Sequence, residues 1–264
     1  MFRIQKILKV WIGKNDDKIS TSTFELRGPN VTRQKSVVLG AKNIFHRMGL
    51  QVLSAGYNLV VSPDRPDRLL FYQRIFNDIE MVSGDIVECG VWRGESMSAF
   101  AILTQAEEIE RHIWGFDSFE GLPEPTIEDR ASSSFEAEKG WYSGPNQKDV
   151  MLRLQAAGID DVTRTKGVTL VKGWFEDTLA DYQGEIGLLH LDADLYDSTK
   201  CALEFLWPKV SVGGVVVLDE YHVPENWAGE KKAVDEYFAS SFSDGSAILH
   251  EDPISGRFWI KKIR

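Results

Sequence analysis

The chain has 264 residues, of which 43% are hydrophobic and 27% charged, and its 40 acidic and 30 basic side chains give a formal net charge of −10. This composition is typical of a folded globular protein and excludes wholesale disorder. The negative balance argues against nonspecific nucleic-acid binding, which needs a basic surface. Two cysteines, Cys89 and Cys201, are too few for a disulfide framework, so we expect a cytoplasmic protein. No run approaches the roughly 18 apolar residues of a membrane span.

The first 60 residues form an N-terminal extension for which the sequence predicts no definite structure. They begin with MFRIQKILKVWIGK, which carries four basic residues and no acid. Lys6 and Lys9 interrupt its apolar positions, which argues against a signal peptide. A peripheral amphipathic anchor on a membrane surface stays open as an alternative.

From residue 61 to the C-terminus, helical and extended patterns alternate. Apolar residues at helical spacing predict a core-packing helix over 68–81, and a second helix is expected from about Ser96 to Arg111. Short apolar runs predict strands over 85–89, 112–117, 168–173, 186–192 and 212–220. Strands that alternate with helices indicate one α/β domain over 61–264, built on a doubly wound, mostly parallel sheet.

Two later segments depart from this alternation. The candidate strands 246–250 and 256–262 are only about six residues apart, which favours a hairpin and an antiparallel sheet edge. The segment 120–147 is irregular, with prolines, glycines and a run of serines. A long insertion of this kind is usually a lid or a disordered loop. Its aromatic residues Trp141 and Tyr142 favour a lid that contacts substrate.

A first group of candidate site residues follows the first two predicted strands. Glu88 ends the first strand and precedes a turn with glycines at 90 and 94, and Asp117 ends the second strand 29 residues later. Ligands of open α/β sheets bind beyond the carboxyl ends of the strands, where an acid accepts hydrogen bonds from ribose hydroxyls. The pair predicts a cofactor that contains a nucleoside. The alternative is an ordinary glycine turn and a capping acid.

A second group consists of acids that end the next two strands. Asp192 and Asp194 follow the fourth predicted strand, and Asp219 and Glu220 end the fifth. If these strands are neighbours, Asp192, Asp219 and Glu220 converge, and three carboxylates need a cation or protons to share a partly dry site. Oxygen ligands suit Mg²⁺, Mn²⁺ or Ca²⁺. Helix N-capping by each acid is the alternative. His222 is either a base or substrate contact, or an ordinary surface histidine.

In this order, the groups resemble the macrocin O-methyltransferase family, whose members are class I, S-adenosylmethionine-dependent, metal-dependent enzymes that methylate sugar hydroxyls of natural products. The resemblance covers about half of the chain, from Gly84 to about Tyr221. The stretches that carry it are GDIVECGVWRGES, GFDSFEGLP, VKGWFEDTL, LLHLDADLYDST and GGVVVLDEY.

The resemblance implies a seven-stranded sheet whose last strand is antiparallel, and it assigns roles to particular residues. Asp192, Asp219 and Glu220 match the metal ligands, and Asp194 matches a general base. Two positions depart from the family pattern: Glu95 replaces a frequent glycine, and Glu220 replaces a frequent aspartate. The residues implied to bind the cofactor are Glu88, Gly90, Ser96, Asp117, Ser118, Trp174 and Phe175.

We therefore predict an O-methyltransferase that uses S-adenosylmethionine and Mg²⁺, or another divalent cation, to methylate a hydroxyl of a sugar or glycosylated natural product. Metal coordination would lower the pKa of the hydroxyl. The predicted catalytic residues are Asp194, Asp192 and His222. A catechol-type phenol O-methyltransferase and a non-catalytic nucleotide-fold binding protein are the alternatives, whereas the glycine spacing argues against a nicotinamide-dependent dehydrogenase. Enzymes of this type are often dimers or larger, and the sequence does not name the acceptor.

Overall fold

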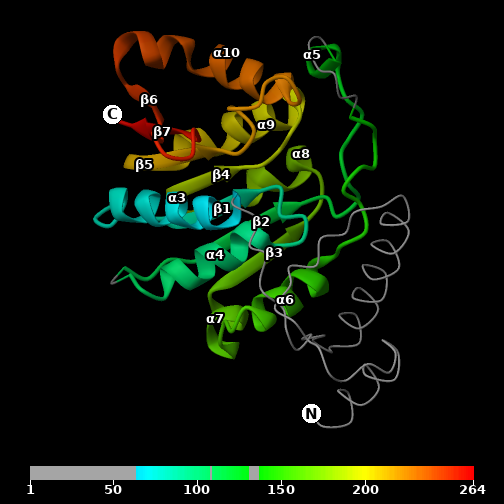
Figure 1. Ribbon diagram of the computed structural model, residues 1–264, viewed down its shortest axis with the longest axis vertical. Helices are drawn as coiled ribbons and strands as arrows, with labels where there is room; N and C mark the ends of the chain where they lie inside the picture. The colour runs from blue at the N-terminus through cyan, green and yellow to red at the C-terminus, as the bar shows by residue number, and fades with distance from the viewer. Residues whose placement is uncertain (1–63, 108, 131–136) are drawn as a thin grey trace, which may run out of the picture. The chain divides into compact units, whose positions relative to one another are not determined.

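The computed structural model describes residues 64–264, except residue 108 and residues 131–136 (Figure 1). The predicted N-terminal extension at residues 1–60 therefore lies outside the described residues. Within the described ranges, no helix is both long and apolar enough to cross a lipid bilayer.

The described residues form a seven-stranded sheet with the order β3-β2-β1-β4-β5-β7-β6. The first five strands in this order are parallel, and β7 runs antiparallel to both β5 and β6. This confirms the predicted doubly wound sheet, its C-terminal hairpin and its antiparallel last strand. The strands are β1 (Asp85–Cys89), β2 (Ile113–Asp117), β3 (Val168–Lys172), β4 (Ile186–Leu191), β5 (Val210–Leu218), β6 (Ala247–Glu251) and β7 (Phe258–Lys262).

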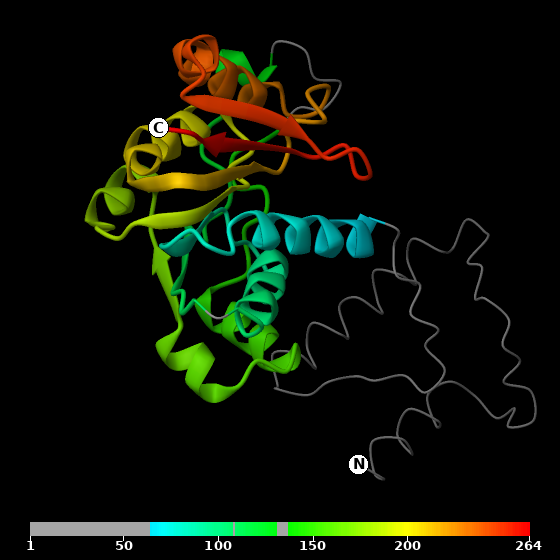
Figure 2. The ribbon, with the colours of Figure 1, turned by 90° about the vertical axis from the view of Figure 1, so that its left-hand side faces the viewer.

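Helices cover both faces of the sheet. Buried side chains of α3, α4 and α6 pack on one face, and those of α9 and α10 pack on the other; Figure 2 shows α3 and α4 on the opposite side of the sheet from α9. The helices are α3 (Asp64–Asp78), α4 (Glu95–Thr104), α5 (Ile127–Arg130), α6 (Gln147–Ala156), α7 (Asp161–Lys166), α8 (Phe175–Thr178), α9 (Tyr196–Leu206) and α10 (Ala228–Asp244), with the 3₁₀ turns η1 (Leu179–Asp181) and η2 (Trp207–Lys209).

The predicted strands are all present, with bounds that shift by at most two residues. The helix expected to run to Arg111 was predicted too long, since α4 ends at Thr104. Arg111 is buried instead, and its guanidinium donates hydrogen bonds to the carbonyl oxygens of Ile79, Val82 and Gly84. The side chain therefore satisfies the backbone after α3, a long-range role that helical periodicity does not encode.

The central strands bring the carboxyl ends of the sheet to one edge. All six residues of β4 are buried, as expected for a parallel strand covered on both faces. Two further backbone hydrogen bonds follow those that pair the strands. The N–H of Asp192 donates to the carbonyl of Cys89 at 2.9 Å, and the N–H of Asp219 donates to the carbonyl of Leu191 at 2.9 Å. The segments that follow β1, β4 and β5 are thus in direct backbone contact.

Candidate active site

A pocket opens at the carboxyl ends of the five parallel strands, where ligands of open α/β sheets bind. Its volume of about 250 Å³ is close to the lower end of the roughly 300–1,000 Å³ typical of small-molecule sites. Glu88 and His222 do not line it. The predicted site residues that do are Gly90, Ser96, Asp117, Ser118, Trp174, Phe175, Asp192, Asp194, Asp219 and Glu220.

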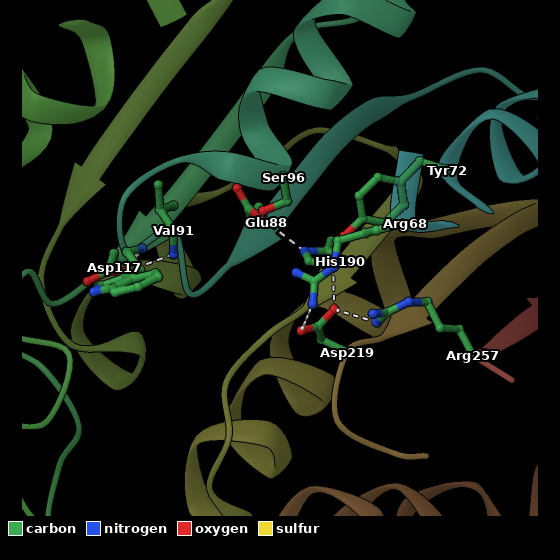
Figure 3. Close-up of polar contacts among 10 residues, drawn as sticks. Arg68, Tyr72, Glu88, Val91, Ser96, Asp117, His190, Asp219 and Arg257 are labelled. Carbon is green, nitrogen blue, oxygen red and sulfur yellow. Dashed lines mark hydrogen bonds and ion pairs between the residues drawn. The ribbon is translucent and has the colours of Figure 1, made fainter. Parts of the chain in front are cut away.

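Asp117 fixes the loop between β1 and α4, residues 90–94, which we call the glycine loop. One carboxylate oxygen of Asp117 accepts hydrogen bonds from the N–H groups of Val91 and Trp92 at 2.8 and 2.7 Å (Figure 3). Gly90 has φ 92°, and a Cβ there would lie 1.8 Å from the carbonyl oxygen of Asp192. Only glycine fits this position. The loop therefore presents its backbone to the pocket between the ends of β1, β2 and β4.

Glu88 lies beneath the pocket wall in a buried polar network. It is fully buried in β1, opposite His190 of β4. One of its oxygens accepts a hydrogen bond from the Ser96 hydroxyl and lies 3.0 Å from His190 Nδ1. The Tyr72 hydroxyl lies 3.1 Å from His190 Nε2. Among the described residues, the second oxygen of Glu88 has no hydrogen-bond partner, so the network has a free acceptor next to Ser96.

Three carboxylates gather at the ends of β4 and β5. Oxygen atoms of Asp192, Asp194 and Glu220 lie within 4.8 Å of one another, and we call these three residues the acid cluster. Burial raises the pKa of Asp192 and of Asp194 well above the ordinary value, and the neighbouring negative charges raise it further. Burial and the charge of Asp219 raise the pKa of Glu220 to about 7. A divalent cation would neutralise the negative charges that crowd together here.

Asp219, which sequence analysis grouped with the metal ligands, has cationic partners instead. Arg68 from α3 and Arg257 from the turn before β7 each reach one of its oxygens at 3.3 Å, and His190 Nε2 lies 3.7 Å away (Figure 3). Although burial raises it, the interaction with His190 and the charges of Arg68 and Arg257 hold the pKa of Asp219 well below its ordinary value. The charge of Asp219 is therefore already compensated by the protein.

Glu230 of α10 is a further buried carboxyl group that sequence reasoning missed. It is fully buried, and one of its oxygens accepts a hydrogen bond from the N–H of Glu220 at 3.1 Å. Burial, followed by the charge of Glu220, raises its pKa well above the ordinary value. Glu230 thus fixes the backbone at Glu220. Glu230 lies in a helix, ten residues after Glu220, and no local sequence pattern indicates that the two residues are in contact.

His222 lies outside the pocket wall. Its ring is half-buried, and burial, followed by the charge of Arg257, lowers its pKa. Its Nδ1 is buried without a hydrogen-bond partner among the described residues. The structure therefore does not bring His222 together with the acid cluster, and a catalytic role for it stays a prediction.

The described parts of the 120–147 insertion pair with each other and reach the pocket. The N–H of Leu122 donates to the carbonyl of Trp141, and the N–H of Gly140 donates to the carbonyl of Leu122, both at 2.9 Å. Gly121 permits this approach, since a Cβ there would lie 2.3 Å from the Trp141 carbonyl oxygen. Of the two predicted aromatic contacts, Tyr142 lines the pocket, whereas Trp141 packs in a small apolar cluster beside it. Closure of this segment as a lid stays a prediction.

The strand order, the antiparallel β7 and a pocket at the carboxyl ends of the parallel strands define a class I methyltransferase fold. A family model described as macrocin-O-methyltransferase (TylF) matches residues 60–242, and the chain belongs to this family. The resemblance read from the sequence is thereby confirmed, and it extends over more of the chain than the motifs indicated.

Individual proteins that are similar to the chain are O-methyltransferases as well. The chain is 37% identical over 148 residues to the 8-demethyl-8-(2,3-dimethoxy-alpha-L-rhamnosyl)-tetracenomycin-C 4'-O-methyltransferase of Streptomyces olivaceus, covering 54% of each chain. It is 34% identical over 191 residues to the demethyldecarbamoylnovobiocin O-methyltransferase of Streptomyces niveus, covering 67% of this chain and 66% of the relative. The matches thus span about half to two thirds of these curated relatives' length.

The solved structure of CalS11, described as a calicheamicin methyltransferase, matches with a TM-score of 0.66 and 25% identity over 94% of this chain and 99% of that one. A second structure of CalS11 describes it as a TDP-rhamnose 3'-O-methyltransferase. This match thus covers a larger share of the chain than the 60–242 range matched by the family model.

Proposed function

We propose that this protein transfers a methyl group from S-adenosylmethionine to a sugar hydroxyl of a glycosylated natural product, with a divalent cation at the acid cluster. One observation carries the proposal: a single pocket joins the glycine loop and Asp117 to the three crowded carboxylates. Two relatives whose names include a rhamnose unit support a sugar as the acceptor.

We assign the methyl donor to the part of the pocket formed by the glycine loop and the ends of β2 and β3. S-Adenosylmethionine supplies a methyl group that is electrophilic because it is bound to a sulfonium. Gly90 permits close approach to the backbone, Asp117 and Ser118 offer acceptors to the ribose, and Trp174 with Phe175 offers apolar surface to the adenine. Ser96 lines this part of the pocket, and Glu88 behind it accepts a hydrogen bond from its hydroxyl and so orients it.

We assign the divalent cation to the acid cluster, with Asp192 and Glu220 as ligands. The chemistry of the donor set fits, because these side chains offer crowded carboxylate oxygen atoms, and among the described residues none of them forms an ion pair with an arginine, lysine or histidine. A divalent cation supplies Lewis acidity, which lowers the pKa of a neighbouring hydroxyl group. The sequence also predicts Asp219 as a ligand, but its contacts with Arg68 and Arg257 support a positioning role next to the cation.

Asp194 is the proposed general base. Its carboxylate lies within 4.8 Å of both proposed ligands, so it reaches the same hydroxyl that they orient. The acceptor oxygen forms a bond to the methyl carbon while the carbon–sulfur bond breaks. The electron pair stays on sulfur in S-adenosylhomocysteine, and Asp194 accepts the proton. Positioning contributes the rest, since the methyl group is already activated.

Calorimetric titration of S-adenosylhomocysteine into the full chain, with excess Mg²⁺ and then with a chelator, tests this proposal. We expect S-adenosylhomocysteine to bind with a micromolar dissociation constant. With S-adenosylmethionine and Mg²⁺ present, we expect the protein to methylate rhamnosides in preference to catechols. Methyl transfer to a catechol but to no rhamnoside would show that the acceptor is a phenol and not a sugar. Folded protein that binds no S-adenosylhomocysteine in either condition would overturn the methyltransferase assignment.

A further inference from the structure

Tyr142 occupies a distinctive position in the pocket. It belongs to the insertion, yet its side chain lines the same pocket as the acid cluster and is 41% exposed. Burial, followed by the negative charges of Asp194, Glu220 and Asp192, raises the pKa of its hydroxyl to about 12, so the phenol stays neutral close to the three acids. Within the described residues, no other side chain donates to or accepts from its hydroxyl.

The Tyr142 ring is held by aromatic neighbours from two other segments. Trp92, in the glycine loop, meets it edge to face at a centroid distance of 5.5 Å, and Trp227 lies at 6.3 Å. The Arg93 guanidinium covers the Trp92 ring at 4.5 Å. Trp227 is itself buried with Leu122 and Leu195. These contacts fix the ring before any ligand binds.

The backbone at Tyr142 and Trp92 also departs from its preferred conformation. Both residues have left-handed φ angles, 64° and 44°, where large side chains are disfavoured. Such conformations persist when surrounding contacts impose them, and they cluster at ligand sites. The Tyr142 ring lines the pocket and stays 41% exposed in spite of its aromatic contacts. Its placement is explained by a ligand that covers it.

We infer that the Tyr142 ring, supported by Trp92, is the platform on which the sugar of the acceptor stacks, with the hydroxyl to be methylated directed at the acid cluster. One face of a pyranose consists of C–H groups, which pack well against the electron-rich face of an aromatic ring. Leu122 and Pro123 extend the apolar wall of the pocket, which favours a 6-deoxyhexose, whose methyl group replaces the hydroxymethyl group of other hexoses. This inference rests on the proposed function and names its acceptor class.

The test compares Tyr142→Asn with Tyr142→Phe in the full chain. Asparagine removes the ring but tolerates the left-handed backbone, whereas phenylalanine retains the ring and removes the hydroxyl. The probe is methyl α-L-rhamnopyranoside, titrated by ligand-detected NMR with S-adenosylhomocysteine and Mg²⁺ present. Tyr237→Leu removes a tyrosine ring of α10 that packs on Phe238 rather than in the pocket, and serves as the matched control.

We expect Tyr142→Asn to weaken rhamnoside binding about tenfold, the scale of a well-formed aromatic contact. Tyr142→Phe and Tyr237→Leu should stay within about twofold of wild type, and S-adenosylhomocysteine affinity should be unchanged in all three variants. Two results would overturn the proposed platform. One is equal rhamnoside affinity in wild type and Tyr142→Asn, and the other is a loss of rhamnoside affinity in Tyr142→Phe as large as that in Tyr142→Asn.

Two further outcomes separate the platform from the proposed function. Wild-type protein that binds S-adenosylhomocysteine but no rhamnoside overturns the platform and leaves the donor site intact. Rhamnoside binding that depends on the Tyr142 ring, in protein without affinity for S-adenosylhomocysteine, supports the platform and overturns the methyltransferase.

Discussion

The ends of β4 and β5 carry acids at matching positions in adjacent strands, but the two regions differ in how their charge is balanced. At the end of β5, Asp219 meets Arg68, Arg257 and His190. At the end of β4, Asp192 and Asp194 crowd against Glu220. The pKa of Asp219 is lowered by its partners, while the pKa of each acid in the cluster is raised by burial and by its neighbours.

The difference shows that proximity of carboxylates does not by itself define a cation site. Glu220 directly follows Asp219 in the chain, yet only Glu220 joins the acid cluster. Arg68 and Arg257 form ion pairs with Asp219. In contrast, burial and neighbouring charges still raise the pKa of Glu220, so an added cation is directed to the acid cluster. Asp219 with its arginines then acts as a rigid boundary of the site.

Asp192→Asn is expected to have the largest effect. It removes a proposed ligand, so turnover should fall at least about 100-fold, while S-adenosylhomocysteine affinity stays within about twofold. Steady-state kinetics and calorimetry measure the two quantities. Asp161→Asn, at an exposed acid of α7, is the control. Near-normal turnover in Asp192→Asn would remove the acid cluster from the mechanism.

Asp219→Asn should mainly reduce stability. It leaves Arg68, Arg257 and His190 without their shared carboxylate, and breaking a buried ion pair costs about 3–5 kcal/mol. Asp192→Asn, in contrast, relieves like-charge repulsion and should leave the metal-free protein at least as stable as wild type. Urea unfolding of both variants in chelator gives the comparison. An equal loss of stability in both would contradict the contrast between the two regions.

Divalent cation should stabilise the wild-type protein through the acid cluster. At a concentration about 100 times its dissociation constant, a ligand that binds only the folded state adds about 2.7 kcal/mol. For a domain of this size, the midpoint of thermal unfolding should therefore rise by roughly 5–10 °C. Scanning fluorimetry with Mg²⁺ and with chelator measures this shift. A shift that persists undiminished in Asp192→Asn would locate the cation elsewhere.

Arg153→Ala should have the smallest effect. Arg153 compensates Glu95 at 3.0 Å, but both side chains are about one third exposed, and solvent screens such pairs. We expect the free energy of unfolding to change by less than about 1 kcal/mol. A loss comparable to that of Asp219→Asn would show that charge compensation at the surface matters as much here as it does in the interior.

The sequence predicted the sheet well because its information is local. Each parallel strand is a short apolar run, and the acids that end β1, β2, β4 and β5 follow directly from the chain. The balance of charge at Asp219 was not predictable in this way. Arg68 lies 151 residues before it and Arg257 lies 38 residues after it. Only the packing of α3 on the sheet and the pairing of β7 with β5 bring them together.

The insertion is a second feature that the sequence predicted only in part. Its composition predicted an irregular segment with substrate contacts, but it did not separate Tyr142 at the pocket from Trp141 in the neighbouring apolar cluster. That separation depends on the pairing of residues 121–122 with 140–141, which two distant glycines permit and no spacing rule encodes.

The left-handed backbone also matters for engineering this protein. Among the described residues, those other than glycine with positive φ are Trp92, Phe119, Tyr142 and Asp194, and all but Phe119 line the pocket. Replacing such a residue by glycine or asparagine relieves strain of about 1–3 kcal/mol. A library selected for heat resistance alone would therefore enrich changes at these positions and lose activity as it gained stability. Selection for thermostability should hold Trp92, Tyr142 and Asp194 fixed.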